Sequence, residues 1–166
     1  AEIQKRQQEE QRREALEKAL AGPLAAGRVT LDNGKIGISG NVLFAHNSDQ
    51  LQPEGKQLLQ TLAPPITAYL GASDQILMIS GFTDDMPVRD NNRKFADNWE
   101  LSAQRALTVT RTLIEEGVPS TAIFAAAFGS QQPVADNADP EGRARNRRVE
   151  MAPVPKSSTN GKAGND

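Results

Sequence analysis

Two side chains of opposite charge, Asp84 and Arg105, stand where a strand is expected to end and where a helix is expected to begin. The apolar strand finishes in Gly81-Phe82-Thr83-Asp84, and after a polar loop a helix opens with Asn98, Leu101 and Arg105 on one side. This order brings a carboxylate and a guanidinium to the opening of one pocket. A ligand with both an ammonium and a carboxylate, such as an amino-acid head group, would meet complementary charge at both ends. The pattern favours a binding module over an enzyme.

Catalytic readings of the same sequence have less support. His46 is the only histidine, so a common metal site lacks a second one, and no Ser–His–Asp order with an oxyanion signature is visible. Asp84, Asp85 and Asp90 could be imagined as paired carboxylates for sugar cleavage, but residues on one loop need not converge. We therefore expect no catalytic residue, no metal site and no cofactor.

Four arginines, at positions 143, 145, 147 and 148, raise the question of a nucleic-acid-binding patch. No aromatic residues lie between them, and Glu141 and Glu150 flank them, which favours a structural role at a strand end. The whole chain has 19 basic and 21 acidic residues and a net charge of -2, so no global field attracts a polyanion. We expect no nucleic-acid partner.

The length of 166 residues suits one domain with ragged ends. The absence of cysteine excludes disulfides, thiolate zinc sites and a cysteine nucleophile. The longest apolar runs fall far short of the roughly 20 residues that a membrane helix needs. Because the sequence starts at Ala1 inside a charged helical pattern, we expect an upstream segment that it does not contain.

The N-terminal part of the chain predicts a helix and a hairpin. Residues 2–20 carry acids and bases at i,i+4 spacing, and Gly22-Pro23 is expected to end this helix. No apolar residue lies between Ile3 and Ala15, so we expect a solvated spacer, with a short dimerisation or plug role left open. Asn33-Gly34 predicts a hairpin between the first two of three short strands. These strands are expected over residues 29–32, 35–39 and 42–44.

Two longer helices are expected in the middle of the chain. The first starts at Pro53, and Pro64-Pro65 must interrupt or kink it. Its apolar stripe is Leu58, Leu59, Leu62, Ile66 and Tyr69. The second covers about residues 97–116, with Asp97 and Glu100 resembling a capping box. Its predicted stripe is Ala103, Ala106, Leu107, Thr110, Leu113 and Ile114, which leaves Asn98, Leu101 and Arg105 on the opposite face and away from the core.

Three further strands and a terminal tail complete the prediction. The strands are expected over residues 75–80, 122–128 and 147–152, with a short helix or turn over 140–146. The tail from Pro153 to Asp166 is rich in Pro, Ser, Gly, Asn and Lys and has nothing to bury, so we expect it to be disordered.

Four segments, read in order, resemble the OmpA-like peptidoglycan-binding domain over about residues 40–152. They are Gly-Phe-Thr-Asp at 81–84, Asn-Trp-Glu-Leu-Ser-Ala-Gln-Arg-Ala at 98–106, Phe-Gly-Ser-Gln-Gln-Pro at 128–133 and Gly-Arg-Ala-Arg-Asn-Arg-Arg-Val-Glu at 142–150. The Asn-Trp-Glu-Leu-Ser segment and the long loop before it look most like the periplasmic C-terminal domain of MotB-type stator subunits. Phe82 stands where this family usually has His or Tyr, so it keeps a ring and loses a polar group.

The resemblance implies an α+β fold, an OmpA-like βαβαβ sandwich with one mixed sheet packed against helices. Together with the charge pattern and the composition of the two ends, it predicts three regions. Residues 1–22 would form a charged helical spacer, residues 28–152 the OmpA-like domain, and residues 153–166 a disordered tail.

The family grips the diaminopimelate side chain of the peptidoglycan stem peptide, and this implies ligand-binding roles here. Asp84 would accept from the ammonium, and Arg105 would donate to the carboxylate. The other implied site residues are Thr83, Asn98, the backbone at Leu101, Phe82 and Arg148. Arg148 would buttress the site, with Arg147 left open as the alternative.

The function that the resemblance implies is non-catalytic peptidoglycan binding, which anchors a membrane complex such as a MotB-like ion-driven stator to the cell wall. We expect a periplasmic domain tethered to the inner membrane, a membrane partner subunit reached through the upstream segment, and a homodimer. The alternatives are an OmpA-fold protein-interaction module without the ligand site, an outer-membrane lipoprotein anchor without motor function, and a cell-wall hydrolase.

Overall fold

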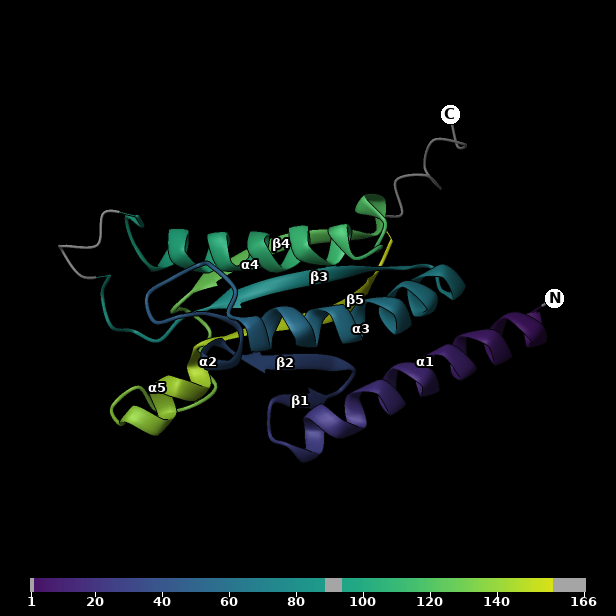
Figure 1. The fold of residues 1–166 in the computed structure, drawn as a ribbon, viewed down its shortest axis with the longest axis horizontal. Coiled ribbons are helices and arrows are strands. Elements are labelled where there is room, and N and C mark those ends of the chain that lie inside the picture. Colours follow the sequence, from purple (N-terminus) through teal and green to yellow (C-terminus); the bar gives the residue numbers. More distant parts are fainter. Residues whose placement is uncertain (1, 89–93, 157–166) are drawn as a thin grey trace.

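One mixed sheet of five strands organises the computed structural model of the chain, which describes residues 2–88 and 94–156. The strand order is β1-β2-β5-β3-β4, so the last of the described strands lies at the centre. Helices α3 and α4 cover one face of the sheet, and α1 lies beside α3 (Figure 1). The expected α+β fold with one mixed sheet under helices is confirmed. Within the described residues, no helix combines the length and apolar character that a membrane span requires.

The predicted hairpin is present with its predicted turn. β1 (Val29–Asp32) pairs antiparallel with β2 (Lys35–Ser39), and Asp32 lies opposite Lys35. Asn33 and Gly34 have φ values of 52° and 82°, in the left-handed region that a two-residue type I′ turn requires.

The strand expected over residues 42–44 is wrong, because α2 (Gly40–Leu43) forms a single helical turn there. The Ser39 hydroxyl caps this turn by accepting from the Asn41 N–H at 3.2 Å. Leu43 and Phe44 are both buried, whereas neighbouring residues of a strand point to opposite faces. Burying both side chains on one side therefore favours the turn.

Helix α3 (Pro53–Ala72) carries the predicted stripe and is not interrupted at Pro64-Pro65. Leu58, Leu59, Leu62 and Ile66 are buried. The two prolines remove the donors that would satisfy the carbonyls of Gln60 and Thr61, four residues earlier. Both of those residues are exposed, so water can solvate the carbonyls and the helix continues.

Helix α1 (Glu2–Ala25) passes through Pro23 and ends beyond the expected stop at Gly22-Pro23. Gly27, with a φ of 74°, ends it. The Gly27 N–H donates to the Leu24 carbonyl and the Arg28 N–H donates to the Pro23 carbonyl, the bonding pattern of a Schellman motif.

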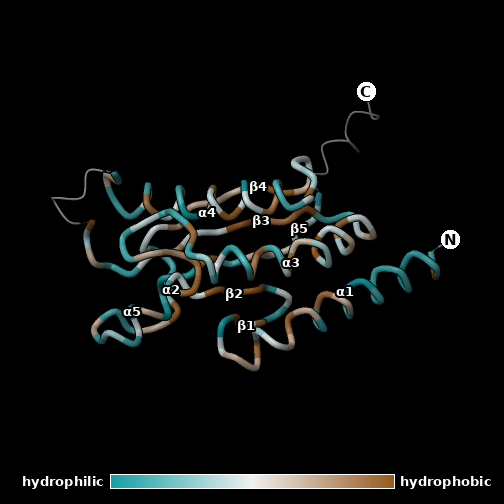
Figure 2. Tube along the Cα trace, viewed as in Figure 1, coloured by the Kyte–Doolittle hydropathy of each residue, from teal (hydrophilic) through white to brown (hydrophobic). Residues whose placement is uncertain are grey.

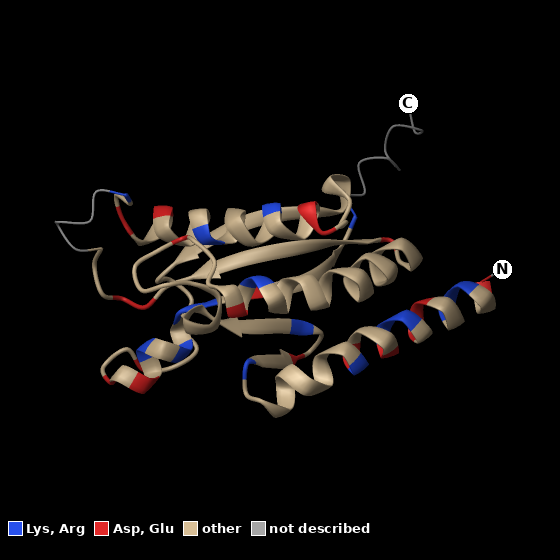
Figure 3. Cartoon of the chain, in the orientation of Figure 1, with Lys and Arg blue, Asp and Glu red and all other residues tan. Residues whose placement is uncertain are grey.

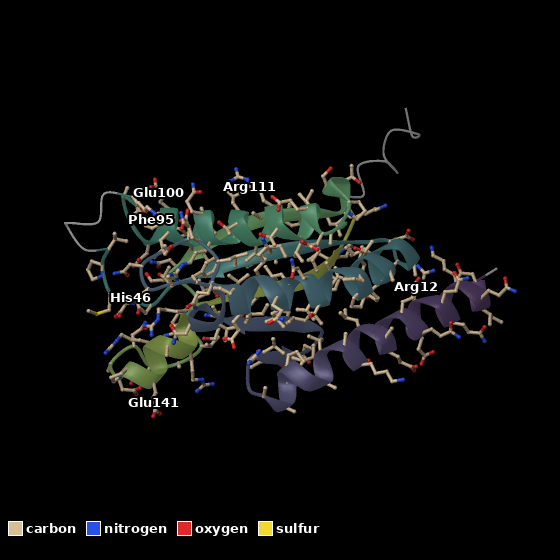
Figure 4. All side chains as sticks on the ribbon, in the orientation of Figure 1. Arg12, His46, Phe95, Glu100, Arg111 and Glu141 are labelled. Carbon is tan, nitrogen blue, oxygen red and sulfur yellow. The ribbon has the colours of Figure 1, made fainter. Side chains whose placement is uncertain are left out.

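Only the first part of α1 has the character of a solvated spacer. Segments coloured blue for basic and red for acidic residues follow one another along its first turns (Figure 3), and the last turns are apolar (Figure 2). Leu20 is 1% exposed and belongs to the core. Arg12, which points from α1 toward α3 (Figure 4), donates through Nη1 to the Ala68 carbonyl at 2.8 Å. From Arg12 onward, α1 is therefore part of the folded unit.

The parallel pair β3 (Gln75–Phe82) and β4 (Ile123–Gly129) is joined through α4 (Asn98–Glu115) and the 3-10 turn η1 (Ser120–Ala122). Gly81 lets α4 approach β3 closely, because a Cβ at this position would collide with the Ser102 carbonyl. The end of β3 and the start of α4 are thereby held together.

The face of α4 that meets the core differs from the predicted stripe. Ser102, Ala106, Val109 and Leu113 are buried, whereas Ala103, Leu107 and Ile114 are only partly covered. Leu101 and Arg105, expected away from the core, are 7% and 6% exposed. The segment between α2 and α3 covers this flank of the helix, since Arg105 reaches the Ser48 carbonyl within it.

Strand β5 (Arg148–Pro155) follows helix α5 (Pro140–Asn146) and runs past the expected end at residue 152. Pro153, Val154 and Pro155 pair with Leu77, Ile76 and Gln75, so these residues extend the sheet and do not start a tail. Residues 157–166 lie outside the described part of the chain. Because β5 pairs with both β2 and β3, it joins the hairpin to the parallel pair.

Candidate ligand-binding site

A cleft of about 630 Å³ lies at the end of the sheet where β3 finishes. Helices α2 and α5 and the start of α4 meet at this end of the molecule (Figure 1). The walls of the cleft come from α2 and the segment after it, the segment after β3, the first turns of α4, and the junction of α5 with β5. The lining residues include Phe44, Thr83, Asp84, Asn98, Leu101, Arg105, Arg143 and Arg147.

Asp84 is an oriented and nearly buried carboxylate in this cleft, with 8% of the residue exposed. Its Oδ2 accepts from Arg147 Nη1 at 2.6 Å, and its Oδ1 accepts from the Met86 N–H at 3.0 Å. These two donors fix the plane of the carboxylate. A carboxylate oxygen can accept more than one hydrogen bond, so both oxygens retain acceptor capacity.

Arg105 is a buried guanidinium on the α4 wall of the same cleft. Its Nε donates to the Ser48 carbonyl at 2.9 Å, and its Cζ lies 5.0 Å from the centroid of the Phe44 ring. Among the described residues no carboxylate lies within ion-pair distance of it. Burial, and next the positive charge of Arg147, lower the pKa of Arg105 to about 10, against opposing effects of Asp84 and Asp49. The group is therefore charged at neutral pH, and its two Nη atoms have donors to offer a ligand.

Thr83, Asn98 and Leu101 shape the space between the two charges. The Thr83 hydroxyl donates to the Asp84 carbonyl at 2.8 Å, and its N–H donates to the Gly129 carbonyl at 2.8 Å. Asn98 Nδ2 donates to the Met86 carbonyl at 3.0 Å and to the Asp84 carbonyl at 3.4 Å, so it ties the segment after β3 to α4. Leu101 contributes an apolar wall. Asp97, not Asn98, is the N-cap of α4, as the capping-box pattern predicted.

Phe82 and Arg148 do not line the cleft. Phe82 stacks on Phe128 with ring centroids 5.0 Å apart, and Arg148 Cζ lies 3.8 Å from the centroid of the Phe82 ring. Arg148 Nε also donates to Glu150 Oε2 at 2.8 Å. Phe82 and Thr83 point to opposite sides because side chains alternate along an extended chain.

Of the two neighbouring arginines, Arg147 is the one that reaches the cleft. The sequence leaves this choice open because both residues precede an apolar strand. The signal that decides it is strand alternation: Val149 and Met151 are buried under the helices, and Arg148 lies on the other face with Glu150.

His46 and Asp85 are the other described residues that the sequence raises as candidates for chemistry. His46 lines the cleft from the segment after α2 (Figure 4), and it is the only histidine of the chain. Asp85 is exposed, and Asp90 lies outside the described residues. Within the described ranges, no group of three or more His, Cys, Asp or Glu side chains could hold a metal ion. The described groups suit a small zwitterion, with Asp84 for a cation and Arg105 for an anion.

The sequence matches the OmpA family over residues 43–147. Two relatives are Motility protein B of Bacillus subtilis, 42% identical over 83 residues, and Peptidoglycan-binding protein ArfA of Mycobacterium tuberculosis, 37% identical over 112 residues. These alignments cover 49% and 68% of this chain. The chain spans only about a third of the length of these relatives, 31% of the first and 32% of the second.

A solved structure with the same fold is the cell wall anchor of the T6SS from Pseudomonas aeruginosa. It superposes with a TM-score of 0.71 at 31% sequence identity, over 82% of this chain and 94% of that one. The segment that matches the family, residues 43–147, contains all of the cleft-lining residues except Gly40 and Asn41.

Proposed function

This chain belongs to the OmpA family, and from that membership we propose that its cleft binds peptidoglycan and anchors a larger assembly to the cell wall. The names of the relatives support this proposal, since one is a peptidoglycan-binding protein and a structural neighbour is a cell wall anchor. The proposed ligand group is the diaminopimelate side chain of the stem peptide, which ends in an ammonium and a carboxylate on one carbon. No chemical step is assigned to the cleft.

The observation that carries the proposal is that Asp84 and Arg105, buried to 8% and 6% exposure, line the same cleft. Asp84 would accept from the ammonium, and the Nη atoms of Arg105 would donate to the carboxylate. A hydrogen bond to a charged group contributes about 1.5–3 kcal/mol when its partners are held in place, and exposed pairs contribute much less. Burial of both residues therefore gives the clamp its selectivity for a zwitterion.

Thr83, Asn98 and the backbone at Leu101 complete the proposed pocket. Arg147 takes the supporting role that the family resemblance left open between it and Arg148, since it holds the Asp84 carboxylate at 2.6 Å. We assign Phe82 and Arg148 a structural role, because the stack of Arg148 on the Phe82 ring supports the end of β3.

The assembly that we propose for the full-length protein is a MotB-like stator in the periplasm. It is supported by the 42% identity to Motility protein B. Tethering to the inner membrane, a membrane partner subunit and a homodimer belong to this proposal.

The test is calorimetric titration of the chain with a diaminopimelate-containing muropeptide and, as a matched ligand, the same peptide with lysine in that position. Lysine keeps the ammonium and lacks the second carboxylate. We expect saturable binding of the first peptide and roughly 10- to 150-fold weaker binding of the second, the equivalent of about 1.5–3 kcal/mol.

The matched protein variants are Asp84→Asn and Arg105→Gln, with Arg145→Gln as the control because Arg145 is exposed and outside the cleft. Arg105→Gln should abolish the preference for diaminopimelate, because it removes the donor to the second carboxylate. Asp84→Asn should weaken the binding of both peptides, because both carry the ammonium. The control should keep both the affinity and the preference. Equal affinity of the parent for the two peptides would exclude the clamp. Absence of binding to intact peptidoglycan would favour the interaction-module alternative.

A further inference from the structure

Trp99, the only tryptophan of the chain, is an exposed aromatic residue beside the cleft. It is 51% exposed, although tryptophan is on average among the more buried residues. It lies in the first turn of α4, directly after the cleft residue Asn98, but it does not line the cleft itself. The start of α4 and the end of β4 lie at the same end of the molecule as the cleft (Figure 1). The zwitterion clamp makes no use of this side chain.

One face of the Trp99 indole rests on the backbone of Gly129, the last residue of β4. The position that a Cβ of Gly129 would occupy lies 3.3 Å from two bonded ring atoms of Trp99, Cδ2 and Cε3. Cδ2 is shared by both rings of the indole, so equal distances to these two atoms place that position above the ring and not at its edge. Because half of the residue is exposed, the opposite face of the indole is open to solvent.

Hydrogen bonds fix the backbone under this ring and connect it to the cleft. The Gly129 N–H donates to Ser102 Oγ at 3.0 Å, and the Ser102 hydroxyl donates to the Trp99 carbonyl at 3.0 Å. The Gly129 carbonyl accepts from the Thr83 N–H at 2.8 Å, and Thr83 lines the cleft. Gly129 therefore contacts the indole on one side and a cleft residue on the other, so the ring has a fixed position relative to the cleft.

The segment that follows Gly129 is polar and uncharged. It continues as Ser130, Gln131 and Gln132, and the two glutamines are exposed. Residues 117–135 contain no Asp, Glu, Lys or Arg, although 24% of the chain is charged. Serine hydroxyls and glutamine amides can both donate and accept hydrogen bonds. This segment therefore suits the hydroxyl and amide groups of a neutral ligand, whereas an ionic ligand would find no opposite charge within it.

We propose that the open face of Trp99 stacks on a sugar ring of the glycan strand whose stem peptide occupies the cleft. One face of a pyranose presents several C–H groups, which pack on the negative face of an aromatic ring. The two residues between diaminopimelate and the sugar span roughly 7 Å when extended, and Trp99 directly follows a cleft residue, so one ligand reaches both places. The inference rests on the proposed function of the cleft and adds recognition of the glycan to it.

Calorimetry with two ligands separates the sugar contact from the peptide contact. The ligands are a diaminopimelate-containing tetrapeptide and the same tetrapeptide joined to its disaccharide of N-acetylglucosamine and N-acetylmuramic acid. The parent should bind the second ligand about three- to tenfold more tightly, and Trp99→Leu should bind both equally. Phe124→Leu is the matched control and should keep the difference, because Phe124 is also exposed but lies about 17 Å from Gly129 along β4. Circular dichroism checks that both variants fold.

Tryptophan fluorescence of the parent reports on Trp99 alone, because the chain has no other tryptophan. Saturating disaccharide-tetrapeptide should protect this fluorescence from quenching by acrylamide more than the tetrapeptide does, since a stacked sugar covers the open face of the indole. Equal affinity of the parent for the two ligands, or equal protection by them, overturns the inference and leaves the clamp intact. If neither ligand binds, the proposed function fails. Millimolar disaccharide alone then decides the inference: protection supports it, and no protection overturns it.

Discussion

Arg147 Nη1 and Asp84 Oδ2 lie 2.6 Å apart and join the end of β3 to the junction of α5 and β5, 63 residues later in the chain. The side chains are 28% and 12% exposed. The pair therefore has two roles: it orients the carboxylate proposed to meet the ligand, and it ties together two segments that enter the cleft from different strands.

Removing either partner of this pair should lower stability. We expect Arg147→Gln and Asp84→Asn each to reduce the free energy of unfolding by about 1–2 kcal/mol, because a largely buried charge loses its partner. The double variant should lose less than the sum, which a double-mutant cycle in urea measures. Arg145→Gln, on an exposed arginine, is the control. Strict additivity would mean that the pair contributes nothing beyond its separate residues.

The buried guanidinium of Arg105 should give stability a dependence on alkaline pH. Its folded-state pKa of about 10 lies below that of a free guanidinium, so below pH 10 both states are protonated and the burial penalty is complete. Above pH 10 the folded state releases a proton that the unfolded chain retains, and the free energy of unfolding of the parent rises. Relative to Arg105→Met, the rise is at most about 1.4 kcal/mol per pH unit.

Urea unfolding of both proteins at about pH 8 and about pH 11 checks this sign, since all other titrating groups are common to the two. If the free energies of unfolding of the two proteins changed with pH by the same amount, Arg105 would keep an ordinary pKa in the folded state.

Gly81 should tolerate no side chain. An alanine Cβ there meets the Ser102 carbonyl, so Gly81→Ala must push α4 away from β3 and should reduce the free energy of unfolding by about 3 kcal/mol or more. Gly22→Ala is the matched substitution, because it lies in helix α1 with no atom within 4 Å of the added Cβ. It should raise stability by about 0.5–1 kcal/mol. Thermal unfolding compares the two, and similar effects would contradict the close approach.

Helix α1 should contribute to stability mainly through the buried apolar residues of its C-terminal half. Leu20→Ala removes a side chain that is 1% exposed and should cost about 2–5 kcal/mol, whereas Ile3→Ala, at a residue 72% exposed, should change stability by less than about 0.5 kcal/mol. Denaturant unfolding measures both. A small effect of Leu20→Ala would restore the interpretation of the whole helix as a spacer.

The local patterns of the sequence predict the elements that rest on a strong local signal. Asn33-Gly34 specifies the hairpin, and Asp97 with Glu100 marks the start of α4, because each depends on residues a few positions apart. The extent of β5 was underestimated for the opposite reason. Pro153 and Pro155 read as breakers, and only pairing with β3 keeps them in the sheet.

The candidate site was partly predictable for the same physical reason. Asp84 and Arg105 could be placed at the opening of one pocket because the end of a strand and the start of a helix are local features. The burial of Arg105 could not be foreseen, since it comes from a segment 57 residues earlier that supplies the Ser48 carbonyl. The assignment of Arg147 to the cleft and Arg148 to the Phe82 ring depends on where β5 begins, which the apolar pattern leaves uncertain by one residue.

The central position of β5 has a consequence for biosynthesis. Of the five described strands it is the last to be made, yet within this sheet it alone joins the hairpin at one side to the parallel pair at the other. While residues 148–155 remain inside the ribosome, the two halves have no shared backbone hydrogen bonds, and Asp84 has no Arg147. Non-local strand pairing of this kind slows folding. Completion of the sheet therefore waits for β5, and the cleft forms in the same step that closes the sheet.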